Sequence, residues 1–275
     1  MKKADEAKTA VLAFITYDFN TVNTVVNVAE ELNIPVIVMF HPAYESEYRA
    51  STVEAFSGLA ISEAERVKTP VALHLDHCSD FSYIKRAINV GFTSVMYDGS
   101  MYDFERNLRE TKEVVDYAHA RNVDVEAELG PIFEGADTEA IDNIEEYTQP
   151  EAAGLFCRET GCDSLAIAIG NAHGYYRKSP NLHFDVLERI NDATDAFLVL
   201  HGGSGISNES LRRAFSKGIN KLNIGIEFLN TYFKETVNYS NRFSDDHNHI
   251  ISDHSSYVQK ALTDYLRVKM RLSEF

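Results

Sequence analysis

Residues 70–97, PVALHLDHCSDFSYIKRAINVGFTSVMY, contain one complete unit of a pattern that recurs along the chain. A short apolar run, Pro70–Leu75, precedes a stretch with helical periodicity, Asp80–Val90, and a second apolar run follows at Thr93–Tyr97. Gly91 stands where a left-handed residue would end the helix. A buried strand, a helix and another buried strand in this order predict two parallel strands joined by a crossover helix.

The same alternation extends outward over nearly the whole chain. Further apolar runs predict strands at Val11–Thr16, Ile34–Phe40, Asp124–Leu129, Asp163–Ile169, Phe197–Leu200 and Lys221–Ile224. Helical periodicity recurs at Thr21–Leu32, Ala50–Arg66, Phe104–Ala120, Glu151–Thr160, Phe184–Ile190, Ser210–Lys217 and Phe228–Tyr239. Gly161 and Gly218 follow helical runs as Gly91 does. Strict alternation of strands and helices predicts a parallel sheet covered by helices.

Two architectures fit this alternation, a closed barrel and an open doubly wound sheet. The length of 275 residues and the eight predicted strands, which alternate with helices, favour the barrel. No GxGxxG follows the first strand, which disfavours the open dinucleotide-binding sheet. We therefore predict an α/β fold, a TIM (β/α)8 barrel, as a single domain over residues 1–275. Residues 240–275 are expected to form a C-terminal helical extension, with an amphipathic helix near Ser255–Leu272.

The composition excludes several classes of function. The chain has 26 Lys and Arg against 42 Asp and Glu, a net charge of −16, which disfavours nucleic acid and anionic membranes as partners. Three cysteines without a CxxC pair do not predict a disulfide framework and suit a reducing cytoplasm. The charged start, MKKADEAKTA, does not resemble a signal peptide, and no apolar run reaches the roughly 18 residues of a membrane span.

Histidines stand at the predicted carboxyl ends of three strands, where barrel enzymes carry their chemistry. His77, His173 and His201 stand at or shortly after the ends of three of these predicted strands. Neutral imidazoles that converge from separate strands predict an open zinc site, with a position left for a substrate oxygen. The alternative for each is a rim histidine bonded to backbone. The histidines of the C-terminal tail, His247, His249 and His254, are predicted to lie in a solvated loop instead.

Other strand ends carry acidic or glycine-rich sequences. Glu126 and Glu128 lie two residues apart on one face of the fifth strand. They are either an inward pair at the site or, for one of them, part of an interior layer paired with Lys or Arg. Gly202, Gly203 and Ser204 follow the seventh strand and could bind an anion through backbone N–H groups. The alternative is a tight turn that requires glycine.

Taken together, five segments resemble the class II (zinc-dependent) ketose-bisphosphate aldolases, with the tagatose- and fructose-bisphosphate aldolases closest. They are LHLDH, VEAELG, AIGNAHG, VLHGGSGI and KLNIGIE, and the resemblance covers about residues 10–240. It implies a barrel enzyme that forms a homodimer or homotetramer. Such an enzyme reversibly cleaves a ketose phosphate into dihydroxyacetone phosphate and an aldehyde.

The resemblance also implies roles for individual residues. Zinc would be held by His77, His173 and His201, and Glu128 matches a carboxylate presented to a mobile zinc ion. Asp76 matches the aspartate that exchanges a proton with the oxygen of the aldehyde carbon, and Asn223 the residue that orients the enediolate. The ketone-side phosphate, often with a monovalent cation (Na⁺ or K⁺), would lie on Gly174, Gly202, Gly203 and Ser204.

The chemistry of carbon–carbon cleavage agrees with a metal site. Cleavage next to a carbonyl needs an electron sink, which a zinc ion supplies as a Lewis acid. Asp76 could take up the hydroxyl proton of the departing carbon. No lysine stands at the predicted carboxyl end of a strand, the nearest being Lys178 on a loop, so a Schiff-base route is disfavoured.

The sequence departs from the family pattern around the substrate. Ile226 replaces a threonine that would bond phosphate, and Ala136 falls where a mobile-loop glutamate is expected, so Glu134 or Asp137 would have to substitute. The first strand ends in Phe14-Ile15 instead of Phe-Asn, and Phe40–Tyr44 replaces a loop rich in Ser and Thr. We therefore expect retained zinc binding and a smaller or less phosphorylated substrate.

Two other functions remain open at this point. One is a non-catalytic or altered homologue that binds a sugar phosphate, and the other is a different metal-dependent barrel enzyme, such as an epimerase.

Overall fold

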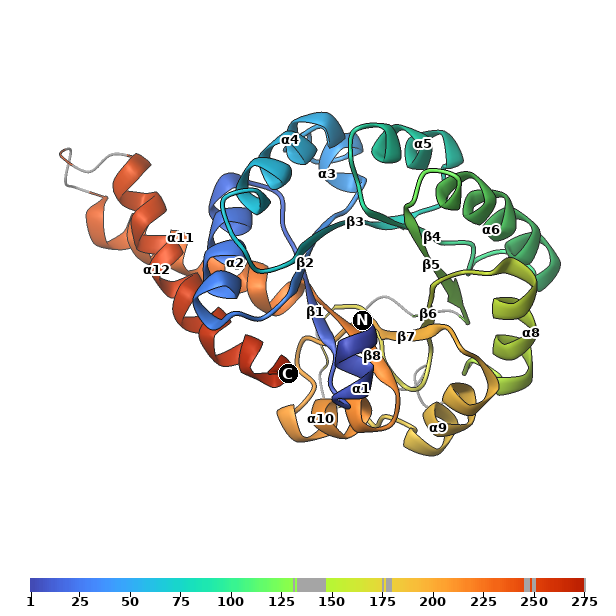
Figure 1. Cartoon of the computed structure of the whole chain (residues 1–275). Coiled ribbons are helices and arrows are strands. Elements are labelled where there is room, and N and C mark those ends of the chain that lie inside the picture. The colour runs from blue at the N-terminus through green and yellow to red at the C-terminus, as the bar shows by residue number, and fades with distance from the viewer. Residues whose placement is uncertain are drawn as a thin grey trace.

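In the computed structural model, eight parallel strands close into one barrel, with β8 pairing back onto β1. The strands form an inner ring and the helices an outer one (Figure 1). The strands are β1 (Val11–Ile15), β2 (Val36–Phe40), β3 (Val71–Cys78), β4 (Ser94–Tyr97), β5 (Asp124–Leu129), β6 (Ser164–Ile167), β7 (Phe197–Leu200) and β8 (Ile219–Ile224). The structure describes residues 1–130, 132, 147–174, 176, 180–244, 248 and 251–274. The predicted closed barrel is confirmed, and the open sheet is wrong.

A helix follows each strand along the chain, and these helices carry the expected start and stop signals. They are α2 (Phe19–Leu32), α4 (Val53–Ala64), α5 (Phe81–Asn89), α6 (Phe104–His119), α8 (Pro150–Thr160), α9 (Phe184–Ala193), α10 (Asn208–Ser216) and α11 (Ile226–Phe243). The side chains of Asp18 and Asp103 cap α2 and α6, each accepting a hydrogen bond from a backbone N–H, which contributes about 1 kcal/mol. Gly91, Gly161 and Gly218 have positive φ angles of 106°, 72° and 120°. This confirms the prediction that left-handed glycines follow these helices.

The main core lies between the strands and the helices. Phe14 of β1 packs edge-on against Phe228 of α11, with ring centroids 5.6 Å apart. The ring centroids of Phe40 on β2 and Phe56 on α4 lie 4.6 Å apart. All four rings are fully buried, which stabilises the fold by about 1.5–3 kcal/mol for each side chain.

The inside of the barrel holds a buried ion pair. The Nζ of Lys221 on β8 donates to Oε2 of Glu126 on β5 at 2.6 Å, and the two residues are only 2% and 1% exposed. His74 of β3 completes this layer, with its Nε2 3.3 Å from the same Nζ. Of the two strand-five glutamates, Glu126 is therefore the interior one, and Lys221 is its partner.

Both ends of the chain pack on the barrel. In Figure 1, α1 (Lys2–Glu6) lies across one opening, where Asp5 accepts a hydrogen bond of 3.1 Å from Asn220 of β8. At the other end of the chain, α12 (Ile251–Met270) packs against α11 and α2, and the far part of the α11–α12 hairpin projects from the barrel. A short helix, η2 (Arg271–Ser273), follows it. The expected start of the extension, residue 240, lies inside α11.

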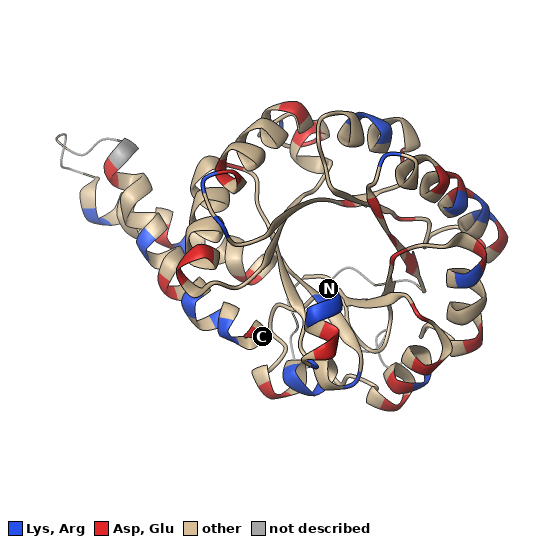
Figure 2. Ribbon diagram, in the orientation of Figure 1, with Lys and Arg blue, Asp and Glu red and all other residues tan. Residues whose placement is uncertain are grey.

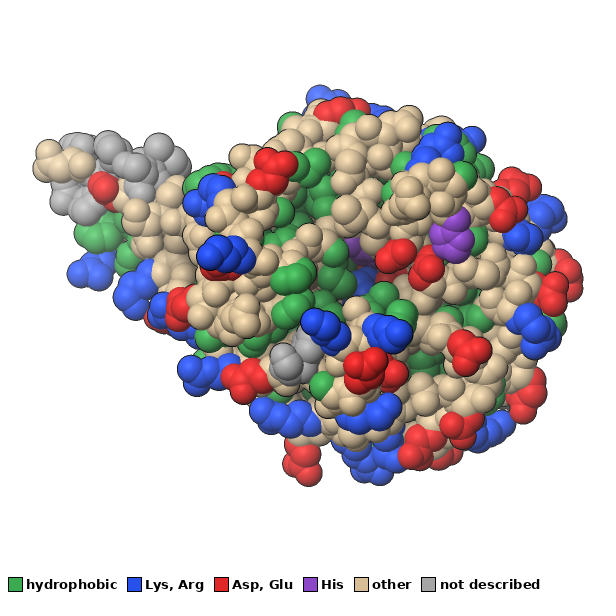
Figure 3. Space-filling model, in the orientation of Figure 1, with side chains coloured by type: hydrophobic (Ala, Val, Ile, Leu, Met, Phe, Trp, Pro, Cys, Tyr) green, Lys and Arg blue, Asp and Glu red, His purple; other side chains and the backbone are tan. Residues whose placement is uncertain are grey.

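The alternation did not predict α1 or α3 (Ala43–Ser46), because each is too short to show helical periodicity. Acidic and basic residues are interspersed along the outer helices (Figure 2), and side chains of both signs cover the face in Figure 3. Within the described ranges, no helix is long and apolar enough to cross a membrane.

A change at the buried ion pair tests its structural role. Lys221→Met leaves the Glu126 carboxylate buried without its partner, so we expect the free energy of unfolding to fall by about 3–5 kcal/mol. The double variant Lys221→Met/Glu126→Gln removes both charges and should lose less stability than Lys221→Met alone. Urea denaturation followed by circular dichroism measures both. A single variant as stable as the wild type would contradict this role.

Candidate active site

A bulge near the end of β3 turns two consecutive side chains into the same cavity. The register of β3 on β4 shifts between Leu75 and Cys78, and His77 has a left-handed φ of 40°. Such an irregularity re-aims the side chains that follow it. As a result Asp76 and His77 both line the cavity at the carboxyl end of the barrel. The apolar run that predicted this strand ends at Leu75, whereas β3 continues to Cys78.

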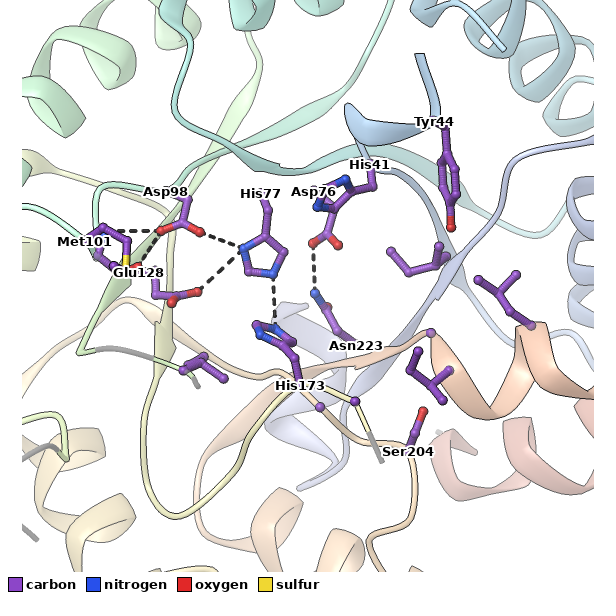
Figure 4. Close-up of a pocket in the computed structure, with 18 residues that line it drawn as sticks. His41, Tyr44, Asp76, His77, Asp98, Met101, Glu128, His173, Ser204 and Asn223 are labelled. Atoms are coloured by element: carbon purple, nitrogen blue, oxygen red, sulfur yellow. Dashed lines mark hydrogen bonds and ion pairs between the residues drawn. The ribbon is translucent and has the colours of Figure 1, made fainter. Parts of the chain in front are cut away.

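Three imidazole nitrogens meet in this cavity. Nε2 of His77 lies 3.2 Å from Nε2 of His173 and 3.0 Å from Nδ1 of His201. The distance between the nitrogens of His173 and His201 is 3.3 Å. Three ligands of a tetrahedral zinc ion, each about 2.0–2.1 Å from the metal, lie about 3.3 Å from one another. The three predicted ligands therefore come together with the spacing of a zinc site; Figure 4 shows His77 facing His173.

Carboxylates fix the orientation of two of these rings. Asp98, which follows β4, accepts a hydrogen bond from Nδ1 of His77 at 2.8 Å. Glu126 accepts one from Nε2 of His201, also at 2.8 Å. Each bond fixes the tautomer that turns the other ring nitrogen toward the centre. Through Glu126, the buried pair with Lys221 thus supports the site directly.

Burial and charge set the protonation of the three rings. Burial, aided by the charge of His77, lowers the pKa of His173 to about 4 and that of His201 well below its usual value. Burial alone would also lower the pKa of His77, but Asp76 and Asp98 raise it to about 10. Two rings are therefore neutral, as metal ligands must be, and a bound metal would replace the proton on the third.

Glu128 lies beside this cluster without a hydrogen-bond partner for one oxygen. Its buried Oε2 is 3.9 Å from Nδ1 of His77 and 3.8 Å from Nδ1 of His201. Burial, with the nearby charge of Asp98, raises the pKa of Glu128 to about 8. His77, Asp98 and Glu128 form a second group whose ligand atoms are close enough to hold a metal. A cation in either position would satisfy this carboxylate.

Asp76 and Asn223 form a buried pair beside the histidines. The Nδ2 of Asn223 donates to Oδ1 of Asp76 at 3.1 Å, and its own Oδ1 is buried with no hydrogen-bond partner among the described residues. Burial would raise the pKa of Asp76, but the positive charge of His77 lowers it. Asp76 is therefore an ionised acceptor that faces the cavity.

Two loops form a polar cradle at the other side of the cavity. Gly174, Gly202 and Ser204 line it, and the two glycines have positive φ angles of 91° and 67°. A Cβ atom on Gly202 would lie 1.9 Å from the carbonyl oxygen of Ala172, so this position requires glycine. The hydroxyl of Tyr176 contacts the carbonyl oxygens of Ala172 and Gly202 at 2.7 and 3.0 Å, which ties the two loops together.

Some predicted site residues do not reach this cavity. Gly203 does not line the cavity. Its N–H donates to the carbonyl oxygen of Asn223 at 3.1 Å, so this N–H is not available to an anion. Glu134, with Ala136 and Asp137, lies outside the described residues, as do Lys178, His247 and His249. The prediction that His254 lies in a solvated loop was wrong. His254 lies in α12, and its Nε2 is 3.1 Å from Oγ1 of Thr236.

Sequence reasoning did not assign several of the residues that line the cavity to the site, among them Asp98, His41 and Tyr44. The cavity measures about 670 Å³. Asp98 directly follows β4, so the search of strand ends would have found it had it included the fourth strand. His41 and Tyr44 follow β2, and the sequence showed them only as a departure from the family pattern.

Comparisons with known proteins show which family the chain resembles. The family model for class II fructose-bisphosphate aldolases matches residues 1–273. The chain is 41% identical over 221 residues to the YdjI protein of Escherichia coli strain K12, covering 79% of this chain and 77% of that one. It is 40% identical over 230 residues to the fructose-bisphosphate aldolase of Geobacillus stearothermophilus, covering 82% and 79%.

Solved structures show the same fold. The crystal structure of the YdjI aldolase from Escherichia coli K12 matches with a TM-score of 0.86 at 34% identity, covering 99% of this chain and 94% of that one. The fructose-bisphosphate aldolase of Campylobacter jejuni matches with a TM-score of 0.81 at 23% identity, covering 99% and 92%, which shows a likeness of fold.

The orienting role of Asp98 gives a testable prediction. Asp98→Asn keeps the size of the side chain but weakens its hold on His77, so we expect the affinity for Zn²⁺ to fall about 10–100-fold. Competition with a chromogenic chelator measures this affinity. Asp116→Asn, an exposed change on α6, is the matched control and should leave it unchanged. Equal affinity in Asp98→Asn and the wild type would show that Asp98 does not position the ligand.

Proposed function

Because the chain belongs to the class II fructose-bisphosphate aldolase family, and is thus an aldehyde-lyase of the aldolase type, we propose that it is a zinc-dependent enzyme. It reversibly cleaves a ketose phosphate, or a related ketose, into dihydroxyacetone phosphate or a similar ketone and an aldehyde. The observation that carries the proposal is the convergence of three imidazole nitrogens within 3.0–3.3 Å of one another, beside an ionised aspartate.

The donor set fits a zinc ion. His77, His173 and His201 would hold it, and Glu128 would offer a carboxylate to a second position. When bound, zinc supplies a Lewis acid that withdraws electrons from the carbonyl of the ketone. The orphaned oxygen of Glu128 and the neutral rings of His173 and His201 support a cation at this place.

Asp76 is the residue placed to move a proton. In cleavage the C3–C4 bond breaks and its electron pair remains on C3, while the C4 hydroxyl loses its proton and becomes the aldehyde carbonyl. The Asp76 carboxylate takes that proton, and in condensation it gives the proton back. Asn223 holds one oxygen of Asp76, which keeps the carboxylate aimed into the cavity, and its amide orients the ketone half.

The cradle would bind the anionic end of the ketone half. Gly174 and Gly202 present backbone to the cavity, and Ser204 accepts a hydrogen bond of 3.1 Å from the N–H of Glu227. This bond leaves the hydroxyl hydrogen of Ser204 to donate to a phosphate oxygen. Backbone N–H and hydroxyl groups can bind an anion without Lys or Arg. This suits a chain whose acidic residues outnumber its basic ones. A monovalent cation (Na⁺ or K⁺) beside the phosphate belongs to the same proposal.

Further parts of the proposal concern the rest of the protein. Glu134, with Asp137 as the alternative, remains the predicted group for the C3 proton. A cytoplasmic location and a homodimer or homotetramer also remain predictions. The exposed Phe233 and Val237 of α11 support association of subunits, because apolar side chains on a projecting helix favour burial. Light scattering in solution measures the oligomeric state.

A change at Asp76 separates proton transfer from metal binding. We expect Asp76→Ala to slow carbon–carbon cleavage about 10²–10⁴-fold, because the base that takes the hydroxyl proton is lost. Zinc content should stay at the wild-type level. The variant should also exchange the C3 proton of dihydroxyacetone phosphate with solvent, because this step does not need the aldehyde oxygen.

Release of dihydroxyacetone phosphate, metal analysis and deuterium exchange followed by NMR measure these three properties. Cleavage at the wild-type rate would contradict the role of Asp76. Zinc-loaded wild-type protein that neither cleaves a ketose phosphate nor exchanges the C3 proton would favour a non-catalytic homologue or another metal enzyme.

Removal of the metal gives an independent prediction. Treatment with a strong chelator should abolish cleavage, and one equivalent of Zn²⁺ should restore it, because the three histidine nitrogens bind zinc tightly. Mg²⁺, which prefers oxygen ligands, is the matched control and should not restore it. Full activity of the metal-free protein would contradict a zinc-dependent mechanism.

A further inference from the structure

The last turn of the C-terminal helix α12 is connected to the cradle through one residue of α11. The Nζ of Lys269, in that turn, donates to Oε2 of Glu227 at 3.1 Å. Glu227 is the second residue of α11, and its backbone N–H donates to Oγ of Ser204 at 3.1 Å. Two hydrogen bonds therefore lead from α12 to the hydroxyl group of the cradle.

The start of α11 depends on other parts of the chain for its position. Its N-cap is Gly225, which has no side chain to accept a hydrogen bond. The first N–H groups of a helix have no partner inside the helix. Ser204 accepts the N–H of Glu227 in place of an N-cap side chain. The loop after β7 thus supplies the cap that the local sequence lacks.

Helix α12 holds the same turn of α11 through side chains. Lys269 is only 7% exposed at its side chain, and a buried ammonium group needs an ion-pair partner, which Glu227 provides. The rings of Phe228 on α11 and Tyr265 on α12 pack with centroids 6.1 Å apart. Burial and the negative charge of Glu227 raise the pKa of Tyr265. Tyr265 is therefore neutral, and Lys269 supplies the positive charge beside Glu227.

The charge of Glu227 matters to an anion in the cradle. Its carboxylate lies within one side-chain length of the N–H that Ser204 accepts. A negative charge there repels a phosphate bound at Ser204, and the ion pair with Lys269 offsets this repulsion. Lys269 is not among the residues that line the cavity, so it acts through Glu227 and does not touch the anion.

We propose that Lys269 is a positioning residue for the phosphate of the ketone half. This inference rests on the proposed function, in which that phosphate lies on the cradle. Lys269 fixes the first turn of α11, so that Ser204 accepts the N–H of Glu227 and keeps its hydroxyl hydrogen for the phosphate. It also offsets the carboxylate of Glu227 near the bound anion. The C-terminal helix is thereby part of the phosphate site.

The test compares two ketones that differ only in the phosphate. Deuterium exchange followed by NMR gives kcat/KM for dihydroxyacetone phosphate and for dihydroxyacetone. Lys269→Met removes the charge at similar side-chain length, and it should lower kcat/KM for the phosphorylated ketone about 3–10-fold. The value for dihydroxyacetone and the affinity for Zn²⁺ should not change. No loss with dihydroxyacetone phosphate, or an equal loss with both ketones, overturns the inference.

Two further variants serve as controls for this comparison. Lys269→Arg keeps the positive charge and should keep the wild-type ratio of the two kcat/KM values. Lys260→Met removes a lysine from an exposed ion pair with Asp264 on the same helix and should also leave the ratio unchanged. A loss of ratio in Lys269→Arg as large as that in Lys269→Met would overturn the role of the charge.

A double variant covers the case in which Lys269→Met does not fold. Glu227→Gln/Lys269→Met removes both charges and leaves no unpaired carboxylate. Its ratio should lie between those of the wild type and Lys269→Met, because the hold on α11 is lost but the repulsion is absent. A double variant with the wild-type ratio overturns the positioning role. A ratio no higher than that of Lys269→Met overturns the charge argument.

The same measurements separate this inference from the proposed function. Zinc-loaded wild-type protein that exchanges dihydroxyacetone phosphate, with Lys269→Met equally active, keeps the proposed function and loses the inference. Wild-type protein that binds zinc but exchanges neither ketone loses the proposed function itself.

Discussion

The close approach of three imidazole nitrogens is the constraint around which the carboxyl end of this barrel is built. The three ring nitrogens lie only 3.0–3.3 Å from one another. They therefore cannot all carry a proton that points toward their common centre. Burial keeps His173 and His201 neutral, and carboxylates turn His77 and His201 so that their lone pairs converge. The bulge in β3 and the interior ion pair of Lys221 with Glu126 both serve this convergence.

Patterns with a fixed period made the fold predictable from the sequence. Strands such as Asp124–Leu129 and Phe197–Leu200 have the predicted bounds, because apolar runs with clear breaks determine them. The three histidines were predictable for the same reason, since parallel strands bring their carboxyl ends together. The short helices α1 and α3 were not, because a single turn shows no periodicity.

The orientations and contacts of several site residues depend on tertiary geometry that the sequence does not show. His77 points into the cavity only because the bulge breaks strict alternation, and no residue type signals that bulge. The N–H of Gly203 is taken up by Asn223 from a neighbouring strand, which the glycine-rich motif does not reveal. Lys221 is 95 residues from Glu126 along the chain, so the sequence suggested an interior partner without identifying it.

The acidic balance of the chain acquires a specific meaning in this cavity. A net charge of −16 opposes the approach of anions, and the described lining adds three carboxylates but neither Lys nor Arg. The cradle of Gly174, Gly202 and Ser204 can bind one phosphate through backbone and hydroxyl groups.

The central claim is that the three histidines bind one zinc ion and leave a position open for substrate. Zinc K-edge X-ray absorption spectroscopy on protein loaded with one equivalent of Zn²⁺ tests it most directly. The account predicts three imidazole nitrogens at about 2.0–2.1 Å and one further oxygen ligand, with one imidazole fewer in His173→Ala. A spectrum with fewer than three imidazoles, or one that His173→Ala leaves unchanged, would contradict it.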